Sequence, residues 1–135
     1  MHREFSAGGI VFNKGKVLLV QPSGTEYWMF PKGHIEKGQT TKEAALREVK
    51  EEGGVEAEIV AKVGDSKYVY THPQSKEKTF KVVTIFLMKY KSGDPQDHDW
   101  EVAEAGWYDP EEALKKLSFS NDKNLLKKAL EMKNG

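Results

Sequence analysis

Three glutamates stand close together in the stretch GHIEKGQTTKEAALREVKEEGGV, which runs from residue 33 to residue 55. Glu48, Glu51 and Glu52 occupy one short segment whose pattern is helical. Carboxylates three or four residues apart on a helix lie near one another, and each like-charge pair costs about 0.2–0.5 kcal/mol. A hard divalent cation such as Mg²⁺ binds carboxylate oxygens and would offset this repulsion. The spacing indicates either a solvated acidic helix surface or a metal site.

A helical wheel at about 100° per residue separates this segment into an apolar arc and an acidic stripe. The arc, which we expect to face the core, holds Ala45, Leu46, Val49 and Gly53. Glu52 falls at the edge of the arc and the other two glutamates lie further out, so we expect Glu52 to be the most buried of the three. Arg47 precedes Glu51 by four residues, a spacing that favours an ion pair. A solvated acidic face would not need to border the core, so this position of the acidic stripe favours the metal site.

Local signals define the bounds of this helix. Thr40 and Glu43 form a capping-box pattern, TTKE, which predicts that the helix begins at Thr40. Gly53 and Gly54 supply the left-handed geometry that ends helices. Two further helices are predicted over residues 110–117 and 121–132.

Five segments rich in β-branched and aromatic residues are typical of strands. They cover residues 5–12, 16–21, 55–63, 67–72 and 80–90. Residues 13–15 read as a tight hairpin turn between the first two, and residues 67–90 read as a second hairpin with a longer loop. We therefore predict a mixed α/β fold and a single domain over residues 1–135.

The chain has 135 residues, 21 basic and 21 acidic side chains, and no cysteine. Such a balance gives no net field toward nucleic acid or an anionic membrane, so phosphate affinity must come from a local arrangement. The absence of cysteine excludes disulfides and thiolate metal sites. The longest apolar run, residues 82–88, is far shorter than the ~20 residues that span a bilayer. We expect a soluble cytoplasmic protein without a membrane partner, either a monomer or a homodimer.

The same stretch resembles the Nudix box, G x5 E x7 R E U x E E x G U, where U is aliphatic. It matches the box at eight of its nine specified positions. The matching residues are Gly33, Arg47, Glu48, Val49, Glu51, Glu52, Gly54 and Val55. The resemblance implies a Nudix fold, a mixed β-sheet sandwiched between α-helices. It also implies a loop, helix and loop that cradle Mg²⁺, with Mn²⁺ as an alternative, and a pyrophosphate.

The resemblance also implies roles for individual residues. Metal ligands would be Glu48, Glu51, Glu52 and the carbonyl of Gly33, with Arg47 orienting neighbouring carboxylates. Gln39 is the one departure, because the family has glutamate there, and we expect Arg47 to rely more on Glu43 or Glu51.

Many Nudix enzymes place another glutamate before a late aromatic strand. Glu101 lies six positions before Trp107 and Glu104 lies three before it. We prefer Glu101, by its spacing, as a metal ligand or general base, although both could be ordinary surface acids. Glu52 is the alternative base, because partial burial would raise its pKa.

The string W x F P K G H, residues 28–34, resembles the branch of the family that acts on diadenosine oligophosphates. In this branch Lys32, His34 and Lys81 would face the phosphates. Tyr68 and Tyr70 share one face of a strand and could clamp the base, although strand aromatics mostly pack in cores.

These features predict Mg²⁺-dependent hydrolysis of a nucleoside polyphosphate, with diadenosine tetraphosphate giving ATP and AMP as the preferred reaction. Alternatives within the family are ADP-ribose, oxidised or normal nucleoside triphosphates, RNA 5′ ends and inositol pyrophosphates. A Nudix-fold sensor that binds a nucleotide without cleaving it is a further alternative. Such modules usually lose the box glutamates, and this chain retains three of them.

Overall fold

One six-stranded mixed sheet organises the computed structural model, which describes residues 2–134. The strands are β1 (His2–Asn13), β2 (Lys16–Pro22), β3 (Lys32–His34), β4 (Val55–Thr71), β5 (Lys78–Gly93) and β6 (Val102–Tyr108). The helices are α1 (Thr41–Gly53), α2 (Pro110–Lys116), α3 (Ser120–Asn134) and a short 3-10 helix at Pro95–Asp97. The strand order is β4-β5-β1-β2-β6, with β3 paired to β1. Among the strands of residues 2–134, only β1 and β5 pair in parallel, so the predicted mixed sheet is confirmed.

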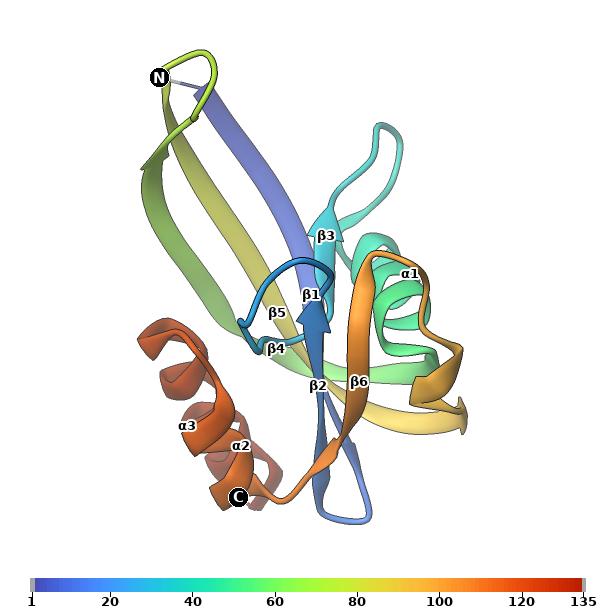
Figure 1. The fold of residues 1–135 in the computed structure, drawn as a ribbon. Helices are drawn as coiled ribbons and strands as arrows, with labels where there is room; N and C mark the ends of the chain where they lie inside the picture. Colours follow the sequence, from blue (N-terminus) through green and yellow to red (C-terminus); the bar gives the residue numbers. More distant parts are fainter. Residues whose placement is uncertain (1, 135) are drawn as a thin grey trace.

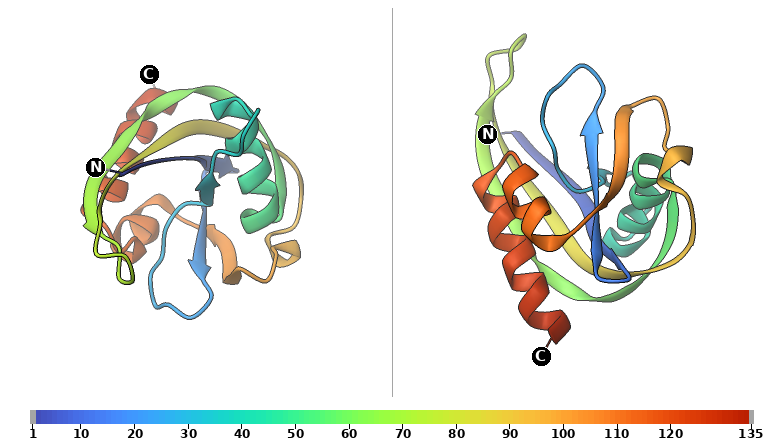
Figure 2. Two further views of the ribbon diagram at one scale, coloured as in Figure 1. Left: turned by 90° about the horizontal axis from the view of Figure 1, so that it is seen from above. Right: turned by 60° about the horizontal axis from the view of Figure 1, so that its bottom comes forward.

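Helices cover the two faces of this sheet (Figures 1 and 2). α1 lies on one face, over a core cluster that includes Val11, Ala45 and Val49. α2 and α3 lie on the other face, over a larger cluster that includes Ile10 and Leu126. Since neighbouring residues of β1 point to opposite faces, Ile10 and Val11 enter different clusters. The predicted sandwich is therefore confirmed.

The local signals act as the sequence predicts. The Thr40 hydroxyl accepts the Glu43 backbone N–H at 3.1 Å, and the Glu43 carboxylate accepts the Thr40 backbone N–H at 2.9 Å. Gly54, with a φ of 75°, ends α1. Lys14 and Gly15 both have positive φ, 52° and 80°, as a two-residue hairpin turn of type I′ requires.

The strand pattern differs from the prediction in two respects. Segments 55–63 and 67–72 form the single strand β4, because Gly64 and Asp65 remain paired to β5 and the Thr84 hydroxyl donates to the Asp65 carboxylate at 2.9 Å. Pairing across the sheet thus overrides the turn-like composition of this segment. β3 and β6 were not among the five predicted segments. β3 is only three residues long, too short to show a period.

The core-facing side of α1 is also rotated from the predicted arc. Leu46 is 37% exposed, whereas Ala44, outside the arc, is fully buried. Glu48 is buried as well. The helical wheel gives the order of residues around the helix axis, but packing against β1 and β3 determines which face of α1 points to the sheet. As a result, part of the acidic stripe is turned toward the protein interior.

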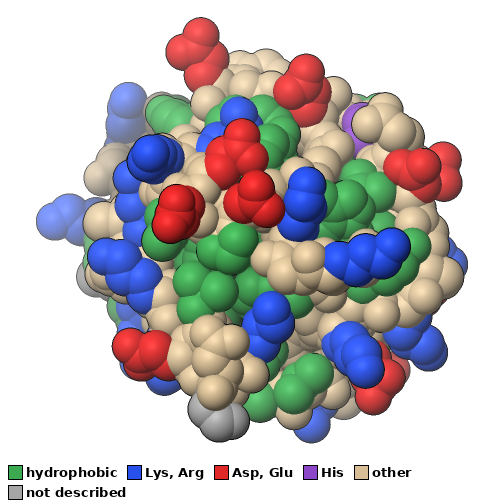
Figure 3. Space-filling model, turned by 90° about the horizontal axis from the view of Figure 1, so that it is seen from below, with side chains coloured by type: hydrophobic (Ala, Val, Ile, Leu, Met, Phe, Trp, Pro, Cys, Tyr) green, Lys and Arg blue, Asp and Glu red, His purple; other side chains and the backbone are tan. Residues whose placement is uncertain are grey.

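Charge is distributed without a dominant sign. On the face seen from below, acidic and basic side chains are interspersed among apolar ones (Figure 3), in keeping with the equal numbers of both. Within residues 2–134, the helices all lack the length and apolar content needed to cross a membrane.

Candidate active site

One pocket of about 490 Å³ gathers most of the predicted site residues. We call it the charged pocket. Its lining includes Lys32, Gly33, His34, Arg47, Glu48, Glu51, Glu52, Lys81 and Glu101. These residues come from β3, α1, β5 and the turn before β6, so the fold brings together side chains that lie far apart in the chain.

Strand β3 fixes the loop side of this pocket against α1. Gly33 pairs with Ala7 of β1, and the backbone N–H of Lys32 donates to Glu52 Oε1 at 3.0 Å. A Cβ atom at residue 33 would overlap the carboxylate of Glu48. Glycine is therefore required here for the backbone to approach Glu48 closely.

Arg47 organises the acidic side of the pocket. Its Nη1 lies 2.9 Å from Glu48 Oε1 and 2.9 Å from Glu51 Oε2. Its Nη2 donates to the His34 carbonyl at 3.1 Å and, less closely, to Gln39 Oε1 at 3.4 Å. The expected support from Glu51 is present. Glu43 gives none, because its carboxylate takes part in the helix cap.

Burial raises the pKa of two glutamates in this pocket, Glu48 and Glu52. Glu48 is only 6% exposed, so the expectation that Glu52 is the most buried of the three is wrong. Burial raises the pKa of Glu48, and Arg47 counteracts the rise. Burial raises the pKa of Glu52 to about 7; the bond from Lys32 opposes this, and the nearby Glu48, Asp99 and Glu101 add to it.

The donor chemistry of the pocket fits a hard divalent cation. All five acidic side chains that line it, Glu36, Glu48, Glu51, Glu52 and Glu101, offer oxygen, the donor that such ions prefer. Between residues 2 and 134, however, no three Asp, Glu or His side chains are gathered tightly enough to enclose an ion. Arg47 instead lies between Glu48 and Glu51 and supplies part of the compensation.

The turn before β6 separates the two late glutamates. Glu101 lines the charged pocket, and its backbone is fixed by bonds from the Ser23 N–H to its carbonyl, at 2.9 Å, and from its own N–H to Asp99 Oδ1, at 3.0 Å. The Asp99 N–H donates in turn to the Glu51 carbonyl at 2.8 Å. Glu104 lines a different cavity, beside Tyr108. The geometry favours Glu101 over Glu104.

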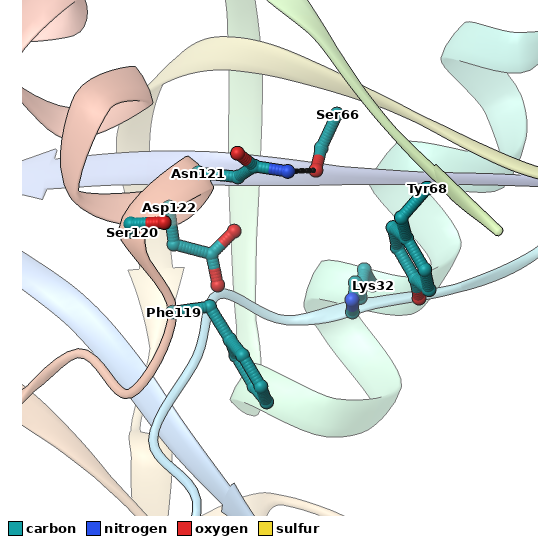
Figure 4. A pocket seen from close by; sticks show the side chains of 7 residues that line it. All are labelled: Lys32, Ser66, Tyr68, Phe119, Ser120, Asn121 and Asp122. Carbon is teal, nitrogen blue, oxygen red and sulfur yellow. Dashed lines mark hydrogen bonds between the residues drawn. The ribbon is translucent and has the colours of Figure 1, made fainter. Parts of the chain in front are cut away.

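A second pocket, of about 370 Å³, adjoins the first (Figure 4). We call it the aromatic pocket. Its lining is Lys32, Ser66, Tyr68, Phe119, Ser120, Asn121 and Asp122, and Lys32 therefore borders both pockets. Tyr68, one of the two tyrosines predicted to clamp a base, lines this pocket. Tyr70 lines neither pocket, because its hydroxyl turns to Glu4 Oε1 at 2.9 Å.

The sequence interpretation missed the half of the aromatic pocket that comes from the start of α3. Phe119, Asn121 and Asp122 carry no motif, and small polar residues are common at helix starts without any ligand. The one available signal was the exposed aromatic Phe119 directly before the helix.

Comparison with known proteins places the chain in a family. Residues 2–129 match the NUDIX domain model. The chain is 32% identical over 139 residues to the putative mutator protein MutT4 of Mycobacterium tuberculosis, covering 96% of this chain and 55% of that protein. It is 28% identical over 138 residues to the ADP-ribose pyrophosphatase of Methanocaldococcus jannaschii, covering 100% of this chain and 78% of that one. The chain thus spans about half the length of the first of these relatives.

The fold comparison agrees. The crystal structure of a Caenorhabditis elegans Ap4A hydrolase binary complex superposes with a TM-score of 0.80 at 26% identity, covering 98% of both chains. The chain belongs to the Nudix family, and the predicted fold is confirmed.

Proposed function

We propose that this protein is a divalent-metal-dependent pyrophosphohydrolase of nucleoside polyphosphates. The observation that supports this most directly is the composition of the charged pocket, where five carboxylates share one volume with Lys32, His34 and Lys81. The acids suit a metal ion, and the basic groups suit the phosphates that the ion would hold. A purely structural acidic helix would not need both sets.

Glu48, Glu51, Glu52 and Glu101, with the backbone of Gly33, would hold Mg²⁺ or Mn²⁺. When bound, such an ion acidifies water and neutralises charge on the phosphates. Arg47 keeps the carboxylates of Glu48 and Glu51 oriented. Lys32 and Lys81 contact nonbridging phosphate oxygens through Nζ, and His34 adds a donor.

Glu52 is our candidate for the general base. A base works best when its pKa is near the working pH, and in the metal-free protein burial raises the pKa of Glu52 to about 7. Its carboxylate accepts a proton from water as the water oxygen bonds to phosphorus and the phosphoanhydride bond breaks. The second oxygen stays tied to the Lys32 N–H, which fixes the side chain. Glu101 is the alternative base.

Our preferred substrate is diadenosine tetraphosphate, giving ATP and AMP. The W x F P K G H string and the similarity to the C. elegans Ap4A hydrolase support this choice. The aromatic pocket also supports it, since Tyr68 can stack on a base while Lys32 contacts the adjoining phosphate chain.

A substrate panel tests the proposal. The purified protein is incubated with Mg²⁺ and, separately, diadenosine tetraphosphate, ADP-ribose, 8-oxo-dGTP and a 5′-capped RNA, and products are separated by chromatography. We expect the fastest turnover for the dinucleotide and none after metal chelation. Dominant turnover of ADP-ribose would refute the substrate, and binding without turnover of any compound would indicate the sensor.

A further inference from the structure

Two hydrogen bonds join the segment before Lys32 to the connection between α2 and α3. The Trp28 backbone N–H donates to the Ser118 hydroxyl at 2.9 Å, and the Ser118 backbone N–H donates to the Trp28 carbonyl at 3.1 Å. The two residues are 90 positions apart in the chain. Trp28 begins the W x F P K G H string, but the proposed chemistry uses neither it nor Ser118. Because both bonds join the same two residues, they close a ring that fixes the distance and the orientation of the two segments.

The Ser118 side chain takes the place of a backbone carbonyl in this ring. In a hydrogen-bonded antiparallel pair, two residues exchange both N–H···O bonds through their backbones. Here the Trp28 N–H bonds to Oγ of Ser118 instead. Any residue except proline can supply the N–H at position 118, whereas serine and threonine are the residues that carry an acceptor hydroxyl on Cβ. The ring therefore depends on a hydroxyl at this position.

The Trp28 ring is held by the same part of the chain. It meets the Tyr108 ring edge to face, with centroids 5.6 Å apart, and Lys116 Nζ lies 4.3 Å from the centre of the indole ring. Lys116 is the last residue of α2, two positions before Ser118. A cation over the face of an indole ring is attracted to it. The end of α2 thus contacts both the backbone and the side chain of Trp28.

The segment from Trp28 to Lys32 is fixed on the sheet. Met29 exchanges two backbone hydrogen bonds with β2, at 2.8 and 3.0 Å. Phe30 is 1% exposed and belongs to the larger core cluster. The Pro31 carbonyl accepts a backbone N–H of β1 at 3.2 Å. Trp28 is therefore a firm attachment point whose position relative to Lys32 is set by the fold.

The connection between α2 and α3 has fewer contacts of its own. Residues 118 to 120 are exposed, and they follow the buried Leu117. Phe119 comes directly after Ser118, and its ring lies 5.2 Å from that of Tyr27, the residue before Trp28. Two consecutive residues of one segment thus face two consecutive residues of the other in antiparallel order. The hydrogen-bonded ring transfers the fixed position of Trp28 to Phe119.

We propose that Ser118 is a positioning residue, which through Trp28 sets the separation between Phe119 in the aromatic pocket and Lys32 at the border of the two pockets. This inference rests on the proposed function, because it concerns a ligand that occupies both pockets. In such a ligand a nucleoside is joined to a phosphate chain, and a fixed separation lets one part bind without further ordering once the other is bound. A ligand that fills one pocket gains nothing from it.

Steady-state kinetics on diadenosine tetraphosphate with Mg²⁺ tests the role. Ser118→Ala removes the hydroxyl and keeps the backbone N–H. We expect KM to rise about 2- to 10-fold, the equivalent of one net hydrogen bond, with little change in kcat. Ser118→Thr keeps the hydroxyl and should keep the parental KM. An unchanged KM in Ser118→Ala, or no rescue by Ser118→Thr, would overturn the inference.

The matched control is Tyr90→Phe. It also removes one hydrogen bond from a side chain to the backbone, that of the Tyr90 hydroxyl to the Gly93 carbonyl at 2.7 Å, and Tyr90 lies outside both pockets. Thermal unfolding should show similar losses of stability in Tyr90→Phe and Ser118→Ala, because each loses one bond of the same kind. KM should change in Ser118→Ala alone. An equal rise of KM in the control would mean that general stability sets KM, and the inference would fail.

Equilibrium binding tests the same role without hydrolysis. Calorimetry compares ADP, which can reach both pockets, with inorganic tripolyphosphate, which fits the charged pocket alone. In Ser118→Ala the affinity for ADP should fall about 2- to 10-fold and that for tripolyphosphate should stay as in the parent. Equal weakening of both would mean that the charged pocket itself had changed, which would contradict a role in the separation of the pockets.

Failure of the proposed function and failure of this inference give different results. If no dinucleotide is hydrolysed but the affinity for ADP falls in Ser118→Ala and not in Tyr90→Phe, the enzyme proposal fails and the positioning role stands. If the dinucleotide is hydrolysed and Ser118→Ala matches Tyr90→Phe in every constant, the positioning role fails and the enzyme proposal stands. A parent protein that neither hydrolyses the dinucleotide nor binds ADP would overturn both.

Discussion

The charged pocket and the aromatic pocket share Lys32 but differ in how they are built. The charged pocket takes most of its groups from one helix and the short strand beside it, and these groups contact one another. The aromatic pocket joins β4 to the start of α3, and within its lining the Asn121 amide donates to the Ser66 hydroxyl at 3.0 Å. In the charged pocket, Arg47 compensates part of the negative charge of the glutamates. The aromatic pocket presents the partly exposed rings of Tyr68 and Phe119, which suit a flat ligand.

The largest effect should follow a change in the charged pocket. Replacing Glu52 with Gln removes a charge without changing shape, and the amide oxygen can still accept the Lys32 N–H. We expect kcat to fall roughly 10²- to 10⁴-fold, the usual contribution of a general base. Thermal unfolding should occur at the same temperature or higher, because the acid with the raised pKa is gone.

Glu104→Gln is the control for this change. Glu104 is an exposed acid that lines a different cavity, so its removal should leave both kcat and KM unchanged. If Glu52→Gln kept more than a tenth of the Mg²⁺-dependent rate, the chemistry would have to be moved to Glu101.

A smaller effect, of a different kind, is expected in the aromatic pocket. Stacking on an aromatic side chain contributes about 1–3 kcal/mol per base, so Tyr68→Ala should raise KM roughly 5- to 100-fold and change kcat little. Tyr70→Phe, which loses only the bond to Glu4, should leave KM unaltered. Steady-state kinetics on diadenosine tetraphosphate gives both constants, and a fall in kcat alone would show that Tyr68 does not bind the base.

These two pockets also show where sequence reasoning succeeds. The box helix follows from signals within a few residues of each other, such as the Thr40 cap and the end at Gly54, and its acids follow from their spacing. The prediction of which side of the helix faces the core was wrong: Leu46 is partly exposed and Ala44 is buried. Packing against the sheet determines this orientation, and the helix sequence alone does not. The aromatic pocket depends on residues 66–68 meeting residues 119–122, and no local pattern encodes that contact.

The buried acid Asp122 should also lower the stability of the protein. Burial raises the pKa of Asp122 above its unfolded value of about 3.9, so the folded state binds the proton more tightly than the unfolded state does. Stability from this group is therefore complete below about pH 4 and falls as the pH rises through the folded pKa. Asp122→Asn should raise the free energy of unfolding at pH 7 by on the order of 1 kcal/mol.

Urea unfolding at several pH values measures this effect. The gain in Asp122→Asn over the parent should shrink toward zero near pH 4 and be largest at neutral pH and above. Asp109→Asn, at an exposed position, should show no such trend. A variant less stable than its parent at pH 7 would mean that the Asp122 carboxylate has a stabilising partner in the fold.

The smallest effect is expected at Gln39, at the rim of the charged pocket, where the family has glutamate. Gln39 Oε1 lies 3.4 Å from Arg47 Nη2, while Glu48 and Glu51 hold the other end of the guanidinium at 2.9 Å each. Arg47 already pairs with Glu48 and Glu51, and its Nη2 lies 3.5 Å from Glu36 Oε1, so Gln39→Glu should leave the rate unchanged or raise it a few-fold. Mg²⁺-dependent kcat measured beside the parent decides this. A collapse of the rate would mean that an acid at residue 39 draws Arg47 away from Glu48 and Glu51, so that the charged pocket requires a weakly binding residue at this position.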